Sequence, residues 1–171
     1  MSKRFTLALF SALMVIAPAT SLWAQNSDTI SSIGFGASYY TAIDDLSSDI
    51  DDNGFSYMIS YQYRPGILGL ELNAELLPEI FNERGFAPSA YVILGKTLYV
   101  AAGIGILSYD GNWANDPYYA FKAGLNLPLS KTITLDIFGN YQFSSKIPVD
   151  DAVDDIDTDT IFLGAALRFG F

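Results

Sequence analysis

Cysteine and histidine are both absent from the 171 residues of this chain. Without cysteine, a secreted protein has no disulfide to staple its fold, so the fold must close in another way. Without histidine, the chain cannot build a Ser-His-Asp or Cys-His catalytic site, nor an imidazole metal site. We therefore expect no enzyme activity and no cofactor, and we assign no catalytic, cofactor-binding or metal-ligating residue.

Basic residues are also scarce. Nine lysine and arginine residues stand against 19 aspartate and glutamate residues, which gives a formal net charge of −10. Such a surface repels nucleic acid, so we expect no nucleic-acid partner. Half of the residues are nevertheless hydrophobic. The two properties are compatible if an apolar wall is separated from charged loops.

No stretch of the sequence is long and apolar enough to be a membrane-spanning helix. The apolar run at residues 5–16 is well short of the roughly 20 residues needed. Two basic residues precede this run and the small residue Ala24 closes the segment, as is typical of a secretory signal peptide. We expect cleavage after Ala24, so that residues 1–24 are a signal peptide and residues 25–171 form one domain.

Alternation of apolar with small or polar residues is the clearest pattern in the chain. In the last stretch, Thr160–Phe171, every second residue back from the end is apolar, and Phe169 and Phe171 are aromatic. The intervening residues are small or polar apart from Phe162. Such alternation predicts a β-strand with one apolar face. Similar patterns predict further strands at residues 33–41, 55–64, 68–76, 89–95, 98–109, 118–127 and 132–143.

The connections between these strands alternate in length. Short connections are expected near 65–66, 95–97 and 128–131, and long ones at 44–54, 77–85, 110–117 and 150–159. About eight strands of about ten residues, joined in this way, are typical of a small up-and-down membrane barrel. The predicted fold class is all-β, an eight-stranded antiparallel up-and-down transmembrane β-barrel.

The two faces of the strands decide between a membrane barrel and a soluble one. In a soluble, lipocalin-like barrel the polar set would face water, but here that set is small and carries few charges. It suits a crowded barrel interior better. The facing of residues 89–95 stays open, because that stretch around Tyr91 is apolar on both sides.

Three segments resemble the family of outer-membrane β-barrel domains that includes the OmpA barrel, the opacity proteins and the Ail-like small barrels. They are the glycine-punctuated stretch Val100–Ile106, the hairpin Lys122–Tyr141 around Pro128, and the terminal Arg168–Phe171. The resemblance implies a monomer in the outer membrane of a Gram-negative cell envelope, with periplasmic termini, short periplasmic turns and long surface loops. Outer-membrane lipids, lipopolysaccharide and the barrel assembly machinery would be its partners. Phe169 and Phe171 match the terminal assembly signal.

This orientation places the basic residues Arg64, Lys96 and Lys131 at the periplasmic turns. It also places two girdles of aromatic side chains at the membrane interfaces. The lower girdle is expected to contain Tyr61, Tyr63, Phe169 and Phe171, and the upper one Tyr39, Phe55, Tyr119, Tyr141 and Phe143.

Five charged residues fall on the face that points into the predicted barrel: Glu71, Glu75, Lys122, Asp136 and Arg168. Glu71 and Glu75 share one strand face, but a spacing of four residues places them about 13 Å apart. That distance is too long for a joint acid–base role. We expect the five residues to form a charge network that fills the bore.

Two acidic stretches form a second candidate site. They contain Asp44, Asp45, Asp49, Asp51 and Asp52, and Asp150, Asp151, Asp154, Asp155, Asp157 and Asp159. The segment Asp49–Gly54 matches the opening of a calcium loop, but its twelfth position is Ser60 rather than a bidentate glutamate. The stretches are interpreted as solvated loops, or as loops that bind divalent cations loosely and bridge to lipopolysaccharide phosphates. Trp113, near Tyr109, is either an adhesive contact or a membrane-interface anchor.

The sequence thus predicts an integral outer-membrane protein with a structural or surface-interaction role, adhesin-like or envelope-stabilising. A narrow porin-like channel for small solutes is the alternative. A third class is a membrane enzyme acting on lipid A, and the absence of histidine argues against its catalytic-triad form.

Overall fold

The computed structural model describes residues 31–42, 53–80, 83–109, 112–147 and 156–171. The regular secondary structure of these ranges is all β-strand, and none of it is a helix that could cross a membrane. The long strands are β1 (Ser31–Ala42), β2 (Asn53–Tyr63), β3 (Leu68–Ile80), β4 (Glu83–Gly95), β5 (Leu98–Gly105), β8 (Tyr118–Pro128), β9 (Ile133–Ile147) and β10 (Ile156–Gly170). The short strands β6 (Ser108–Tyr109) and β7 (Asn112–Trp113) lie between β5 and β8. The predicted signal peptide lies outside the described residues.

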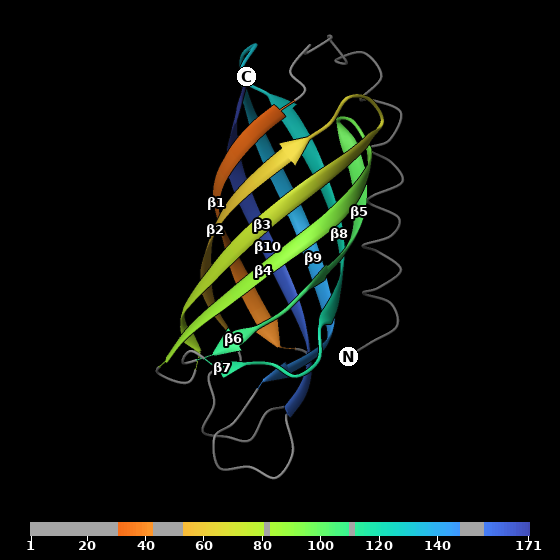
Figure 1. Ribbon diagram of the computed structural model, residues 1–171. Helices are drawn as coiled ribbons and strands as arrows, with labels where there is room; N and C mark the ends of the chain where they lie inside the picture. Colours follow the sequence, from red (N-terminus) through yellow and green to blue (C-terminus); the bar gives the residue numbers. More distant parts are fainter. Residues whose placement is uncertain (1–30, 43–52, 81–82, 110–111, 148–155) are drawn as a thin grey trace, which may run out of the picture.

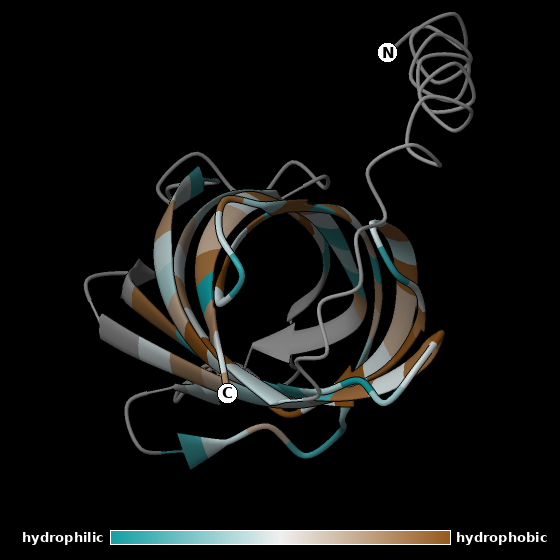
Figure 2. Ribbon diagram, turned by 90° about the horizontal axis from the view of Figure 1, so that it is seen from above, coloured by the Kyte–Doolittle hydropathy of each residue, from teal (hydrophilic) through white to brown (hydrophobic). Residues whose placement is uncertain are grey.

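The eight long strands form a closed antiparallel barrel. Each pairs with the long strand before and after it in the chain, and β1 pairs with β10 to close the sheet. The register of the closing pair runs from Ser32 opposite Gly170 to Ala42 opposite Thr160. The strands wind obliquely around the barrel axis, and the view along that axis shows a ring (Figures 1 and 2). The predicted fold class is confirmed.

Strand alternation separates the two faces of the barrel as the sequence predicts. On β2, Phe55 is 65% exposed on the outside, whereas the next residue, Ser56, is fully buried inside. Leu163 and Leu72 are exposed on the outer wall, and Gln62 is buried in the interior. A continuous apolar wall is suited to hydrocarbon rather than to water, which supports a location in a membrane.

The two ends of the barrel differ. We call one the turn end, because the short connections 64–67, 96–97 and 129–132 lie there, together with Ser31 and the C-terminal Phe171. The opposite end is the loop end, where β1 ends at Ala42, β2 begins at Asn53 and β9 ends at Ile147. Gly95 has a φ of 119° in a tight turn, and a Cβ atom there would clash with the carbonyl oxygen of Leu98. Glycine is the residue that accepts this conformation without strain.

One predicted connection and one predicted strand are wrong. Residues 77–85 are not a long loop, because β3 continues to Ile80 and β4 begins at Glu83, with a register shift between Leu77 and Ile80. The Pro and Gly residues in this stretch suggest a break in the strand, but a ladder with an irregularity accommodates them. Residues 98–109 do not form one strand either, because β5 ends at Gly105.

Between β5 and β8 the chain forms the two short strands β6 and β7. The segment β6 pairs with β4 and with β7, and Ser108 lies opposite Trp113. Trp113 therefore lies in a short strand rather than in a loop. Strand β9 is also longer than predicted, and β10 begins at Ile156, within the acidic stretch that the sequence assigned to a connection.

The open question about residues 89–95 has a clear answer. Ser89, Tyr91 and Ile93 are buried inside, whereas Val92 and Leu94 are exposed on the outer wall. The Tyr91 ring lies against Gly103, where a Cβ would clash with it. The bulky inward residues of β4 thus fit because the neighbouring strand β5 has glycine at that position.

Candidate functional site: a charge network inside the barrel

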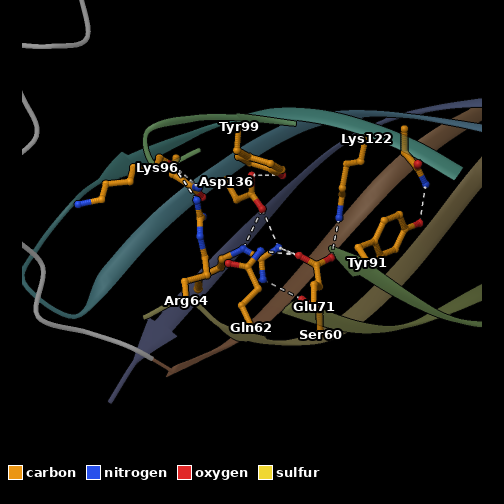
Figure 3. Close-up of polar contacts among 12 residues, drawn as sticks. Ser60, Gln62, Arg64, Glu71, Tyr91, Lys96, Tyr99, Lys122 and Asp136 are labelled. Carbon is orange, nitrogen blue, oxygen red and sulfur yellow. Dashed lines mark hydrogen bonds and ion pairs between the residues drawn. The ribbon is translucent and has the colours of Figure 1, made fainter. Parts of the chain in front are cut away.

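A cluster of charged and polar side chains crosses the barrel interior in its turn-end half (Figure 3). Each member is inward-facing because it occupies the inner parity of its strand. The cluster draws on strands from around the whole barrel: Ser60 and Gln62 from β2, Glu71 from β3, Tyr99 from β5, Lys122 from β8, Asp136 from β9 and Arg168 from β10.

Glu71 is the centre of the network. Its Oε1 lies 2.7 Å from Lys122 Nζ, and its Oε2 lies 3.0 Å from Arg168 Nη2. Arg168 also reaches the other carboxylate, with its Nη2 2.7 Å and its Nε 2.8 Å from Asp136 Oδ2. These four side chains are almost completely buried. Two cations and two anions at close contact leave this group with no formal net charge.

Neutral donors complete the network. Gln62 donates to Glu71 Oε2, and Tyr99 donates its hydroxyl to Asp136 Oδ1 at 2.9 Å. Arg168 Nη1 donates to the hydroxyl of Ser60 at 2.9 Å. Buried charges are tolerable when both Coulombic partners and hydrogen bonds are present, because these replace lost hydration.

Two aromatic rings hold Lys122 in place. Its Nζ lies 4.4 Å from the ring centroid of Phe138 and 5.1 Å from that of Tyr91. A cation over a ring face is stabilised by the ring quadrupole, most strongly where water is excluded. Lys122 is thus fixed by two rings and one carboxylate.

Arg64 also belongs to the site. From the sequence it was predicted only to lie at a periplasmic turn. Its guanidinium carbon lies 5.5 Å from the ring centroid of Tyr99. It donates hydrogen bonds to the carbonyl oxygens of Gly95 and Lys96 (Figure 3). The signal that could have found it is parity, since Arg64 follows the inward Gln62 by two residues.

Glu75 is not in direct contact with the four ion-paired residues, so the predicted five-membered network is wrong in this respect. Its Oε1 accepts hydrogen bonds from Ser38 at 2.9 Å and from Ser56 at 2.6 Å. The physical reason is position, because Glu75 lies four residues closer to the loop end of β3 than Glu71. Ser56 on the neighbouring strand β2 and Ser38 on the next strand, β1, reach it there.

Glycines make room for the network. A Cβ on Gly34 would lie 2.8 Å from both Arg168 Nη1 and the Ser60 hydroxyl. A Cβ on Gly124 would lie about as close to the ring of Tyr99, at 2.6 Å. The small residues of the inward set therefore provide the space that the arginine and tyrosine side chains occupy.

The acidic stretches lie mostly outside the described residues. This holds for Asp44, Asp45, Asp49, Asp51, Asp52, Asp150, Asp151, Asp154 and Asp155. Of the remaining two, Asp157 and Asp159, Asp159 accepts a hydrogen bond from the hydroxyl of Tyr141. Over the described ranges, no group of three or more His, Cys, Asp or Glu residues could hold a metal ion.

Aromatic side chains pair on the outer wall near both ends of the barrel. Phe35 and Phe169 meet edge to face toward the turn end, with ring centroids 6.4 Å apart. Toward the loop end, Tyr119 and Phe143 stack at 5.7 Å. Trp113 is 52% exposed and packs edge-on against Phe86.

Comparison with known proteins places the fold. No protein-family model and no curated protein sequence matches this chain. Among solved structures, the chain is similar to Neisserial surface protein A (NspA), with a TM-score of 0.65 and 18% identity over 82% of this chain and 97% of that one. It is also similar to the N-terminal β-barrel domain of Pseudomonas aeruginosa OprF, with a TM-score of 0.51 and 13% identity over 82% and 97% of the two chains.

A third similar structure is the outer membrane protein AlkL in lipid bilayers, with a TM-score of 0.51 and 13% identity over 86% of this chain and 93% of that one. These identities are low, so the similarity concerns the fold alone. The three-dimensional arrangement is that of small outer-membrane β-barrels.

Proposed function

We propose that this chain is an integral outer-membrane protein with an internally closed barrel, a structural or surface-interaction role and no enzyme activity. The observation that carries the proposal is the ion-paired group of Glu71, Lys122, Asp136 and Arg168, which crosses the bore. These side chains already make ion pairs with one another and hydrogen bonds with neutral side chains, so they are poorly suited to act as acid, base or nucleophile. A bore filled in this way favours stability over transport.

The outer wall supports the membrane location. It exposes large apolar side chains around the barrel, with paired aromatic residues toward each end. In the proposed arrangement residues 1–24 are removed after secretion, and the turn end, with exposed Lys96 and Lys131, faces the periplasm. The barrel assembly machinery would recognise the terminal Phe169 and Phe171.

The loop end would then face the cell exterior. The acidic stretches lead from this end, and they would carry the adhesin-like or envelope-stabilising contacts. Divalent cations held loosely by these carboxylates would bridge them to lipopolysaccharide phosphates. The protein is proposed to act as a monomer among outer-membrane lipids, with no cofactor.

Conductance of the purified barrel in planar bilayers tests the closed-bore part of this proposal. The wild-type monomer should show negligible conductance, and Arg168→Ala should increase it. Whole-cell binding to host matrix proteins, with and without residues 44–52, tests the adhesin-like role. Sensitivity of a deletion strain to envelope stress tests the stabilising role. Normal envelope resistance, together with unchanged cell binding, would contradict both roles.

A narrow channel for small solutes is the second candidate. It is favoured by buried polar atoms that find no hydrogen-bond partner in the described part of the chain, among them Asn73 Oδ1, Ser89 Oγ and Asn140 Oδ1. Water can solvate such atoms in the interior, and a hydrated bore is the first requirement for conduction. A stable ohmic conductance from the wild-type monomer would make this the leading function.

A further inference from the structure

A second layer of buried polar side chains lies on the loop-end side of the charge network. We call it the upper polar layer. Its members come from six strands and each is more than nine-tenths buried: Ser38, Ser56, Asn73, Glu75, Ser89, Tyr118, Asn140 and Gln142. This layer contains Glu75, the inward carboxylate that makes none of the ion pairs described above.

Contacts and register place these side chains around one region of the bore. Asn73 and Ser89 are direct cross-strand partners on β3 and β4. Ser89 is the partner of Gly105 on β5, and the Tyr118 ring lies over Gly105, where a Cβ would clash with it. Glu75 follows Asn73 by two residues on the inner face of β3, so the two side chains enter the bore next to each other.

Five atoms of the upper polar layer lack a hydrogen-bond partner among the described residues. They are Asn73 Oδ1, Ser89 Oγ, Tyr118 OH, Asn140 Oδ1 and Gln142 Nε2. Four of these five are oxygens that can offer lone pairs. The side-chain amide nitrogen of Asn140 is already used, since Nδ2 donates to Tyr91 OH at 3.1 Å. Its carbonyl oxygen, Oδ1, is the atom that lacks a partner among the described residues. Buried oxygens of this kind call for a donor or a cation.

The distribution of charge in the bore indicates whether these oxygens call for a neutral donor or for a cation. In the turn-end network, Lys122 and Arg168 balance Glu71 and Asp136. Glu75 has only hydroxyl donors, both directed at Oε1, and no described cationic side chain pairs with it. A buried carboxylate that makes no ion pair is costly unless it takes up a proton or gains a bound cation.

We propose that the upper polar layer binds an alkali-metal cation, with Glu75 as its anionic ligand and the carbonyl oxygens of Asn73 and Asn140 as neutral ligands. Carboxylate, amide and hydroxyl oxygens are hard ligands, which alkali and alkaline-earth ions prefer. A single carboxylate matches a single positive charge, whereas divalent sites commonly collect several. This inference concerns the interior of the barrel, and it stands whether or not the loops bind a surface partner.

Two measurements test the proposal, both with full-length mature protein refolded in the stated cation. In the first, crystals grown in potassium are exchanged into thallium(I), and the anomalous difference map is inspected. A peak in contact with Glu75 is expected. Absence of any peak inside the barrel would overturn the proposal and leave ordered water as the occupant.

The second measurement is the urea midpoint of unfolding in detergent, in sodium, potassium or choline chloride at equal ionic strength. Sodium or potassium should raise the midpoint of the wild type in a saturable manner, and choline should not. Glu75→Gln should abolish the difference, and Asn73→Ala should shift its half-saturation to higher cation concentration.

Asn126→Ala is the matched control. Asn126 also has an unpartnered Oδ1, but its Nδ2 donates to Lys96 O at the turn end, far from Glu75 along the bore. This variant should lower stability equally in all three salts. A wild type whose midpoint is the same in all three salts would contradict the proposal, as would a Glu75→Gln variant that keeps the cation response.

Discussion

Arg168 on β10 and Glu71 on β3 are 97 residues apart in the chain, yet Arg168 Nη2 and Glu71 Oε2 lie 3.0 Å apart. Strands β2 and β1 separate β3 from β10 in the sheet, so this contact crosses the bore rather than following a strand ladder. Lys122 extends the bridge to β8. The barrel wall is thereby braced from within by side chains that cross the bore.

Replacement of Arg168 by alanine should destabilise the barrel by about 3–5 kcal/mol, because it leaves two buried carboxylates without their shared partner. Urea unfolding in detergent measures the loss, and conductance in a planar bilayer should rise. Lys131→Ala, at an exposed turn, is the control and should change neither quantity. Equal stability of Arg168→Ala and the wild type would argue against a dry, ion-paired interior.

Lys122 and Glu71 should be energetically coupled. Lys122→Met removes the ion-pair partner of Glu71 Oε1, and Glu71→Gln removes the carboxylate that pairs with Lys122, so each single change should destabilise the barrel strongly. The double variant removes both charges and should be more stable than the sum of the single losses predicts. A double-mutant cycle on urea unfolding energies gives the coupling energy. Purely additive losses would mean that the 2.7 Å contact contributes no net interaction.

Gly95 and Gly66 provide a matched pair of turn substitutions. Gly95→Ala should cost about 1–3 kcal/mol, because a φ of 119° is strained for any residue with a Cβ. Gly66→Ala should be nearly neutral, since a Cβ there has open space and no neighbour within 4 Å. Unfolding midpoints of the two variants compare them directly. Similar losses for both would contradict the conformational argument.

The C-terminal aromatic residues should decide membrane assembly. Phe171→Asp, or deletion of Phe171, should prevent insertion into the outer membrane and leave secretion intact. Cell fractionation locates the protein, and the folded barrel should migrate faster on an unheated detergent gel than after boiling. Leu129→Asp, which places the same charge on an exposed turn residue outside the strands, should insert normally. Normal insertion of Phe171→Asp would count against the terminal signal.

Most of the barrel could be predicted from the sequence because strand alternation has a period of two and is a local property. Phe55 and Ser56 point to opposite faces whatever the rest of the chain does. The same parity identified Glu71, Lys122, Asp136 and Arg168 as interior residues. The predicted strand boundaries were wrong at residues 77–85, where Pro78 and Gly85 suggested that a strand ends. Pairing with the neighbouring strand compensates there for a sequence with low β-propensity.

The sequence by itself determined which residues face the interior in every long strand except the one that contains residues 89–95, because alternation requires no knowledge of distant strands. Only the tertiary structure decided which interior residues meet. Arg168 contacts Glu71 because barrel closure and strand stagger bring β10 and β3 to the same depth, whereas Glu75, on the same strand face as Glu71, is left to two serines. The ring over Lys122 and the unpartnered oxygens near Glu75 likewise depend on the stagger of all eight strands. Stagger is set by the closed ladder as a whole, and no single segment encodes it.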